Sequence, residues 1–262
     1  MKSLNLVFVC ILFSFFGYSQ NDNNAEFELL NNSDKWVLEF SDPGTENWKN
    51  NWHLDGLIAK VENTTDGMHV QAGPEFGNDA HHMVLWTKKS LEGDVKIEFD
   101  YTRTDDETKA VNILYIQATG KGEGNYVEDI FEWNELREVP SMRTYFNNMK
   151  TLHISFAAFP NNDDVQDYIR VRRYPVTPEK GFRKLEVEPT FFETGLFRTG
   201  ETYHITALKT NERLFFKVDG KDDTKIYLWD ISHLPPLKKG RVGLRHMYTR
   251  SAIYKDFRIY TK

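Results

Sequence analysis

Two arginines and a tyrosine alternate with apolar residues in DYIRVRRYP, residues 167–175. Successive side chains on a strand point to opposite faces, so Tyr168, Arg170 and Arg172 share one face. Ile169 and Val171 take the other face, which their apolar character assigns to the core. Guanidinium groups this close repel one another unless an anion lies among them, and their geometry matches a carboxylate or sulfate. The row therefore predicts an anion site; the alternative is pairing with acidic residues on an outer face.

His153 lies in TLHISFAAF, residues 151–159, just before this arginine row. Its alternation with Leu152 and Ile154 places it on the polar face with Ser155. Because only the loop 160–166 separates the two segments, we expect adjacent strands with His153 within reach of the arginines. An imidazole can accept a proton near neutral pH, so this position is a candidate base.

Two further segments carry groups of the same kind. In GLRHMYTR, residues 243–250, Arg245 and His246 must point to opposite faces, so only one of them reaches a site unless the strand bulges. In AVNILYIQ, residues 110–117, alternation places Tyr115 and Gln117 on one face and Asn112 on the other.

Metal chemistry and glycoside hydrolysis are disfavoured by the motifs. His81 and His82 are adjacent, so on a strand they diverge and cannot chelate one metal as a pair. The chain contains no HExxH, no CxxC and no regular carboxylate cluster, and we expect neither a metal nor another cofactor. Sandwich glucanases place their acids in the pattern Glu-x-Asp-x-x-Glu. The nearest text here, EWNELRE at 132–138, has Asn134 at the middle acid and the wrong spacing.

Strand-length runs separated by turn signals must position these groups. They occur at 36–40, on both sides of Asp66-Gly67, and at 83–88, 94–103, 110–120, 151–159 and 167–175, and they fill the last third of the chain. NYVEDIFEWNELREVP, residues 125–140, breaks the pattern, because Val127, Phe131 and Leu136 recur at roughly helical spacing. We expect an all-β, two-sheet antiparallel sandwich with one short helical insertion.

The N-terminus predicts export. Lys2 precedes an apolar run from Leu4 to Phe16 and then small residues, the pattern of a secretory signal. We place the signal at 1–19 and a single domain at 20–262. The only cysteine, Cys10, lies inside the signal, and a mature chain without disulfides fits a bacterial periplasm. The formal net charge of −6 argues against nucleic acid, and no second apolar segment is long enough to span a membrane.

Three stretches together resemble the YesU-like family, long catalogued as a domain of unknown function. They are MVLWTKKSLEGDVKIEFDYTR, DYIRVRR and VGLRHMYTRSAIYKDFRIY, and the resemblance covers essentially the whole mature chain. It implies a concanavalin-A-like jelly roll. It also implies a dehydratase that removes water from a glucuronic or iduronic acid at the non-reducing end of an ulvan-type oligosaccharide. The product would be a 4,5-unsaturated uronate.

Such a β-elimination needs three kinds of group. Arg170 and Arg172 can neutralise the uronate carboxylate and stabilise the charge that develops when the C5 proton leaves. His153 or His246 can take that proton, and Tyr168 or Tyr115 can protonate the departing oxygen. The candidate catalytic residues are thus His153, His246 and Tyr168; the candidate substrate-binding residues are Arg170, Arg172, Tyr115, Gln117 and Arg245.

Two other functions remain open on the sequence alone. A polysaccharide lyase would use the same base and neutralising groups but expel a sugar oxygen within the chain. A non-catalytic sugar-binding jelly roll would need only the arginines and an aromatic platform, because a fold does not fix a function. In all three cases the expected partner is an anionic, carboxylated or sulfated oligosaccharide.

Overall fold

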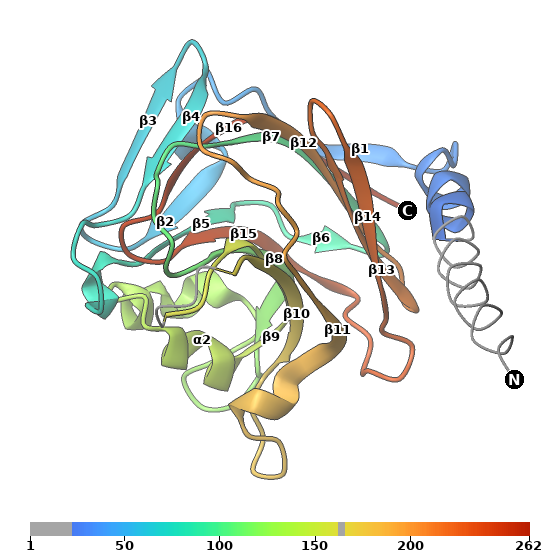
Figure 1. Ribbon diagram of the computed structural model, residues 1–262. Coiled ribbons are helices and arrows are strands. Elements are labelled where there is room, and N and C mark those ends of the chain that lie inside the picture. The colour runs from blue at the N-terminus through green and yellow to red at the C-terminus, as the bar shows by residue number, and fades with distance from the viewer. Residues whose placement is uncertain (1–22, 162–165) are drawn as a thin grey trace, which may run out of the picture.

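The computed structural model describes residues 23–161 and 166–262, so the expected signal at 1–19 lies outside the described residues. Two antiparallel sheets of eight strands each pack face to face (Figure 1). The first sheet contains β1 (Val37–Asp42), β3 (Lys60–Thr64), β4 (Gly67–Gln71), β7 (Val95–Arg103), β12 (Thr202–Lys209), β13 (Arg213–Asp219), β14 (Thr224–Asp230) and β16 (Ser251–Thr261). The second contains β2 (Trp52–Asp55), β5 (Met83–Thr87), β6 (Leu91–Glu92), β8 (Asn112–Gly120), β9 (Met149–Ala158), β10 (Tyr168–Tyr174), β11 (Glu186–Phe192) and β15 (Lys239–His246). The predicted all-β sandwich is confirmed.

Both sheets combine hairpins of consecutive strands with pairings between segments far apart in sequence. The first sheet runs β14-β13-β12-β7-β16-β4-β3, with β1 paired to β16. The second runs β11-β10-β9-β8-β15-β5-β2, with β6 paired to β15. The C-terminal strands β15 and β16 therefore lie inside different sheets, each beside strands from the first half of the chain.

Aromatic residues fill the space between the sheets. Phe99 stacks on Phe257 with ring centroids 5.0 Å apart, and Trp52 meets Phe257 edge to face, also at 5.0 Å. A second apolar cluster lies on the opposite face of the second sheet and includes Trp86 and Tyr115. The second sheet is thus buried on both faces, which explains why all five residues of β5 are buried.

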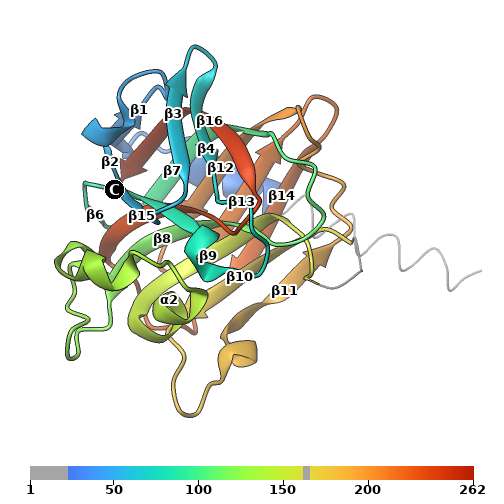
Figure 2. The same ribbon diagram turned by 90° about the vertical axis from the view of Figure 1, so that its left-hand side faces the viewer.

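Helices cover that opposite face (Figures 1 and 2). They are the 3-10 segment η3 (Ile130–Arg137) and the helix α2 (Met142–Asn148). The other helical segments are residues 23–31, η1 (Trp48–Asn50), η2 (Asp79–His81) and η4 (Phe182–Leu185). None of the helices in the described residues is both long enough and apolar enough to cross a bilayer.

The short helical insertion is confirmed, but the apolar residues whose spacing predicted it do not form its buried face. Val127 and Leu136 are exposed, whereas Ile130, Trp133 and Arg137 are buried. A 3-10 segment repeats every three residues, and Trp133 has non-helical backbone angles, so the 3.6-residue period does not apply. The helix α2, which follows it, was not predicted.

Candidate functional site

One row of side chains crosses the outer face of the second sheet, beneath the helices. Arg172 on β10 pairs with His153 on β9, which pairs with Tyr115 on β8. The row continues through Gly243 on β15 to Trp86 on β5. His153 therefore lies directly opposite Arg172. The sequence predicted adjacent strands with His153 within reach of the arginines, and this is confirmed. A side chain at Gly243 would meet the Trp86 ring at 2.4 Å, so the glycine leaves the space that this ring occupies.

A second row lies two residues away from the first along each strand, and it contributes the cations Arg170 and Arg245. Arg170 on β10 pairs with Ser155 on β9, and Ser155 pairs with Ile113 on β8. Ile113 in turn pairs with Arg245 on β15. Because residues two apart on a strand share a face, Arg170, Arg172 and Arg245 all lie on the face that carries His153.

Glu186 on β11 lies between Arg170 and Arg172 of β10. Its carboxylate is 3.0 Å from Arg170 Nε and 3.5 Å from Arg172 Nη2. Thr190 also donates to Glu186 and accepts from Arg170 Nε. The alternative of internal ion pairing therefore holds for this end of the row. Arg172 Nε nevertheless has no hydrogen-bond partner among the described residues.

Four polar side chains next to this pair form a buried cluster. His153 and Tyr174 meet edge to face at 4.8 Å, and Tyr115 lies 5.9 Å from His153. Together with Arg245, these residues are at most 1% exposed. In the described part of the chain, the Tyr115 and Tyr174 hydroxyls, His153 Nδ1, and Nε and Nη1 of Arg245 make no hydrogen bond of ordinary geometry. The Tyr115 hydroxyl is nevertheless close enough to Arg245 and to the Tyr174 hydroxyl to interact with both.

This environment keeps the buried groups neutral, apart from the arginine. Burial, reinforced by the charges of Arg172, Arg245 and Arg170, holds the pKa of His153 well below its ordinary 6.5. Burial raises the pKa of the Tyr115 hydroxyl above 10, although Arg245 opposes the shift. The pKa of Tyr174 is raised still more strongly, again by burial. At neutral pH the cluster thus combines proton donors, a neutral imidazole and a fixed positive charge.

Arg245 is a buried cation without a carboxylate partner among the described residues. Its Nη2 lies 2.7 Å from His82 Nδ1 and donates to the Pro140 carbonyl, and its guanidinium lies 4.7 Å from the centre of the Tyr145 ring. Burial and the Arg245 charge lower the pKa of His82 to about 2, so His82 accepts this hydrogen bond as a neutral ring. A buried, uncompensated guanidinium with two free nitrogens favours a bound anion.

Asp55 on β2 ties the helices to this face. Its Oδ2 accepts from Trp86 Nε1 and Arg137 Nε, each at 2.7 Å, and from the Tyr145 hydroxyl at 2.8 Å. Tyr145, on α2, stacks nearly parallel to Tyr115, with ring centroids 6.0 Å apart. The carboxylate thereby connects η3, α2 and β5 and holds Tyr145 over Arg245.

Two candidate residues predicted from the sequence lie elsewhere. His246 faces the first sheet, where its Nε2 is 2.8 Å from the Tyr254 hydroxyl on β16. It therefore does not join His153, because β15 does not bulge there and Arg245 takes the outer face. Burial, with help from the Arg250 charge, lowers the pKa of His246 to about 3.

Gln117 was predicted to share a face with Tyr115, and this is wrong. A β-bulge between Ile116 and Thr119 gives Gln117 a φ of 50° and turns it away. Its amide oxygen accepts from Lys209 Nζ on β12 at 2.8 Å, and its amide nitrogen donates to the Gly93 carbonyl. Gln117 thus connects the sheets and lies outside the cluster.

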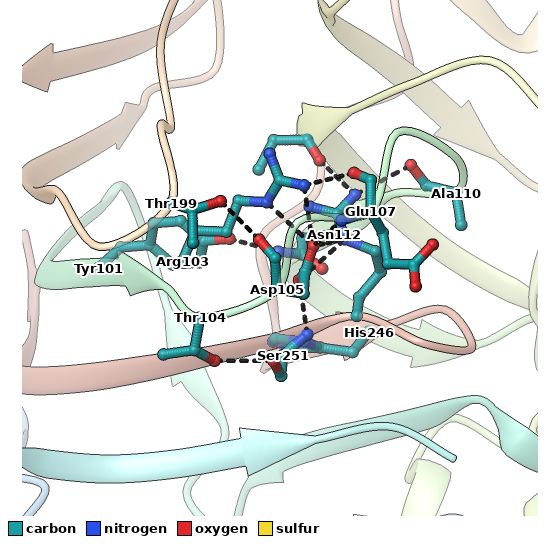
Figure 3. Close-up of polar contacts among 12 residues, drawn as sticks. Tyr101, Arg103, Thr104, Asp105, Glu107, Ala110, Asn112, Thr199, His246 and Ser251 are labelled. Carbon is teal, nitrogen blue, oxygen red and sulfur yellow. Dashed lines mark hydrogen bonds and ion pairs between the residues drawn. The ribbon is translucent and has the colours of Figure 1, made fainter. Parts of the chain in front are cut away.

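His246 lies next to a second buried polar network, centred on Asp105 (Figure 3). Asp105 accepts from Arg103 Nε at 2.9 Å, from Arg250 Nε at 3.1 Å and from the Ser251 amide at 2.7 Å. These charges and hydrogen bonds hold the pKa of Asp105 low despite its burial. Both carboxylate oxygens of Asp105 are used within the protein, so the network joins the ends of β7 and β16. Arg250 Nη2, His246 Nδ1 and Asn112 Oδ1 have no hydrogen-bond partner among the described residues.

Tyr168 lies at the accessible end of the outer face. Its ring packs under Arg170, whose guanidinium is 4.6 Å from the ring centre, and it is 8% exposed. Burial raises the pKa of its hydroxyl, and the charges of Arg170 and Arg172 oppose this shift. Within the described residues, no three histidine, cysteine or acidic side chains gather as metal ligands would.

Sequence reasoning missed four contributors to the site. Tyr174 continues the alternation of Tyr168, Arg170 and Arg172, so the same pattern could have found it. Asp55, Tyr145 and Glu186 come from segments whose local sequence gives no sign of proximity, because only the strand order and the docking of α2 bring them here.

Comparison with known proteins gives the fold. No protein-family model and no curated protein matches the chain. A protein of unknown function with a galectin-like fold from Bacillus subtilis aligns with a TM-score of 0.65 at 16% identity, covering 86% of this chain and 96% of that one. The chain adopts a lectin-like jelly roll.

Two lectin-like structures agree with that assignment. The metal-free exoplasmic/lumenal domain of VIP36 aligns with a TM-score of 0.55 at 13% identity, covering 86% of this chain and 94% of that one. The lectin UEA-II complexed with galactose gives 0.53 at 10% identity, covering 88% and 100%. The predicted jelly roll is confirmed. At these identities the likeness concerns the fold alone, and the activity implied by the YesU-like resemblance stays a prediction.

Proposed function

We propose that this jelly roll is an exported dehydratase that eliminates water from a uronic acid at the non-reducing end of an anionic, ulvan-type oligosaccharide. The observation that carries the proposal is Arg245, a buried guanidinium whose Nε and Nη1 are unpaired beside His153. A uronate carboxylate would supply the missing charge and acceptor oxygens. The secretory pattern at 1–19 supports the export, and the resemblance to the YesU-like family supports the reaction.

The base in this proposal is His153. The His153 ring is neutral at physiological pH because burial and three arginines disfavour the imidazolium. Its Nδ1 has no hydrogen-bond partner among the described residues. A bound carboxylate adds negative charge among the same arginines and so raises the pKa of His153 when the substrate is in place. The arginines meanwhile stabilise the charge that builds up on the carboxylate as the C5 proton leaves.

The acid is a tyrosine. Hydroxide leaves poorly from C4 unless that oxygen is protonated, and a tyrosine with a raised pKa keeps its proton until the transition state. Tyr115 and Tyr174 both present unpaired hydroxyls beside His153, so they suit this role better than Tyr168, which lies farther out with Arg170. The atoms balance: C5 loses a proton, C4 loses hydroxide, and one water leaves as the C4–C5 double bond forms.

A second candidate, non-catalytic sugar binding, is favoured by one observation. His153 is fully buried, and even the side chains of the neighbouring Arg170 and Arg172 are no more than 19% and 12% exposed. The comparison structures include a lectin complexed with galactose, so a jelly roll of this shape can bind sugar without chemistry. A binding module would use the arginines and leave His153 as a packing residue.

One assay separates these functions. The protein is incubated with an oligosaccharide that ends in a saturated uronic acid, and the products are weighed by mass spectrometry. Loss of one water without shortening supports dehydration, fragmentation indicates a lyase, and tight binding without conversion indicates a binding module.

Variants then test the site. Arg245→Gln should lower kcat/KM by about 100- to 1,000-fold, the usual effect of removing one group that stabilises developing charge. Arg198→Gln, which removes a charge from an exposed position, is the matched control and should leave kcat/KM unchanged. Near-ultraviolet circular dichroism checks that both variants fold. Wild-type turnover in a folded Arg245→Gln variant would contradict the assignment.

A further inference from the structure

A separate cleft opens at one end of the second sheet. Its volume is about 720 Å³, within the range of about 300–1,000 Å³ that is usual for ligand sites. Its walls come from the ends of β8, β9 and β10, from the segment that contains η4, and from the loop between β14 and β15. In Figure 1 the η4 segment lies at the lower end of the sandwich.

The cleft is positively charged, whereas the protein as a whole is negatively charged. Six basic side chains line it, against two carboxylates, in a chain of net charge −6. The basic residues are Lys150, Arg173, Lys180, Lys184, Lys238 and Lys239. Of the carboxylates, Glu128 pairs with Lys239 at 2.7 Å, and Glu186 pairs with Arg170 and Arg172 of the site. The remaining five cations have no ion-pair partner among the described residues.

Arg173 shows that the excess of positive charge in the cleft is not confined to side chains in open solvent. It is largely buried in the cleft wall, where its guanidinium donates to the Tyr174 and Pro235 carbonyls while its Nε has no partner among the described residues. Burial alone lowers its pKa to about 10, and no acidic group opposes the shift. An anion in the cleft would relieve this uncompensated charge.

The cleft adjoins the site on the sheet face, because two residues belong to both. Tyr174 lines the cleft, and its ring also packs on His153. Glu186 lines the cleft as well and contacts Arg172. Leu185, Leu234 and Pro235 give the walls an apolar component, which suits the C–H faces of a sugar ring.

We propose that this cleft binds the sulfated part of a linear oligosaccharide whose terminal uronate occupies the Arg245 and His153 site. The inference rests on the proposed function for the position of the terminal sugar. Separate lysine ammonium groups act as mobile point charges, so they suit sulfate esters spaced along a chain. The buried fork of Arg245 suits a single planar carboxylate.

A matched pair of ligands tests the cleft. Isothermal titration at low ionic strength would compare a chondroitin 4-sulfate tetrasaccharide with unsulfated chondroitin tetrasaccharide. Wild-type protein should bind the sulfated ligand more tightly. In Lys180→Gln/Lys184→Gln the affinity for the sulfated ligand should fall by about three- to tenfold, as expected for two exposed charge pairs, and that for the unsulfated ligand should not change.

A double variant with the same charge change is the control. Lys60→Gln/Lys221→Gln removes two exposed lysines, one on β3 at the far edge of the first sheet and one in the β13–β14 turn. It should bind the sulfated ligand like wild type. Equal binding of both ligands by wild type, or an equal loss in this control, would overturn the proposal.

The two proposals fail separately. If the Lys180→Gln/Lys184→Gln variant binds the sulfated ligand more weakly but no saturated uronate loses water, the proposed sulfate site is supported and the proposed dehydratase activity is contradicted. If water is eliminated but sulfation makes no difference to binding, the dehydratase activity is supported and the sulfate site in the cleft is contradicted. Competition by sodium sulfate at millimolar concentration with no preference for the tetrasaccharide would also overturn the oligosaccharide as ligand.

Discussion

At the scale of residues, the site depends on which cations find a partner within the protein. Arg170 and Arg172 share Glu186, whereas Arg245 is buried with two nitrogens unpaired. The same arginines surround His153 and disfavour its charged form. A substrate carboxylate would therefore complete the electrostatics of the site and activate the base in a single binding event.

The pH profile of kcat/KM tests His153 as the base. Because its pKa in the free protein lies well below 6.5, the acidic limb should fall below pH 6.5. Removing one neighbouring cation, in Arg172→Gln, should raise the pKa of His153 and move this limb toward neutral pH. A wild-type limb at or above 6.5, or one that does not move in the variant, would count against His153.

At the scale of elements, the helices α2 and η3 pack on the outer face of the second sheet and enclose the site. Asp55 receives four hydrogen bonds, two from Arg137 and one each from Trp86 and Tyr145, and these residues come from a strand and both helices. The buried Arg137 also donates to the Ile130 carbonyl, so it closes η3 on itself. The helices are therefore fastened through one carboxylate.

Removing the charge of Asp55 should destabilise the protein strongly. In Asp55→Asn the buried Arg137 loses its counter-ion, and breaking a buried pair from one side typically costs about 3–5 kcal/mol. Glu135→Gln, at an exposed position on η3, is the control and should stay within about 0.5 kcal/mol of wild type. Urea unfolding measures both. A change below 1 kcal/mol in Asp55→Asn would show that the helices dock by apolar packing alone.

At the scale of the whole molecule, the second sheet is buried between the first sheet and the helices, and histidines lie on both of its faces. His82 and His153 face the helices, and His246 faces the first sheet. Burial depresses the pKa of all three, to about 2 for His82 and about 3 for His246. The folded protein therefore keeps neutral imidazoles where the unfolded chain would protonate them.

Acid should destabilise the protein in a window set by these histidines. Their folded pKa values lie below the unfolded value of 6.5, so the stabilisation is complete above pH 6.5 and is lost as pH falls toward the folded values. For His82 and His246, whose folded pKa values are about 2 and about 3, the free energy of unfolding should fall by about 2 kcal/mol each between pH 6.5 and 5. Unfolding free energies of His246→Gln across this range should show a shallower slope than wild type. Parallel slopes would contradict the assignment.

The sequence by itself determined the sandwich and much of the outer face. Strict alternation put Ile169 and Val171 in the core and Arg170 and Arg172 outside, because a strand has a period of two wherever its backbone stays regular. The short loop at 160–166 also predicted that His153 lies on a strand adjacent to the arginines, although it did not predict the register that pairs His153 with Arg172. Alternation further required Arg245 and His246 to diverge, without saying which one reaches the site.

Only the tertiary structure decided the rest. The bulge at Gln117 inverted a face that alternation had assigned, and the 3-10 geometry of the insertion buried residues other than those at helical spacing. Asp55, Tyr145 and Glu186 entered the site through strand order and helix docking, which join segments distant in the sequence. Local periodicity determines where a side chain points along its own strand, whereas long-range packing determines what it meets. That is why the arginines could be predicted and their partners could not.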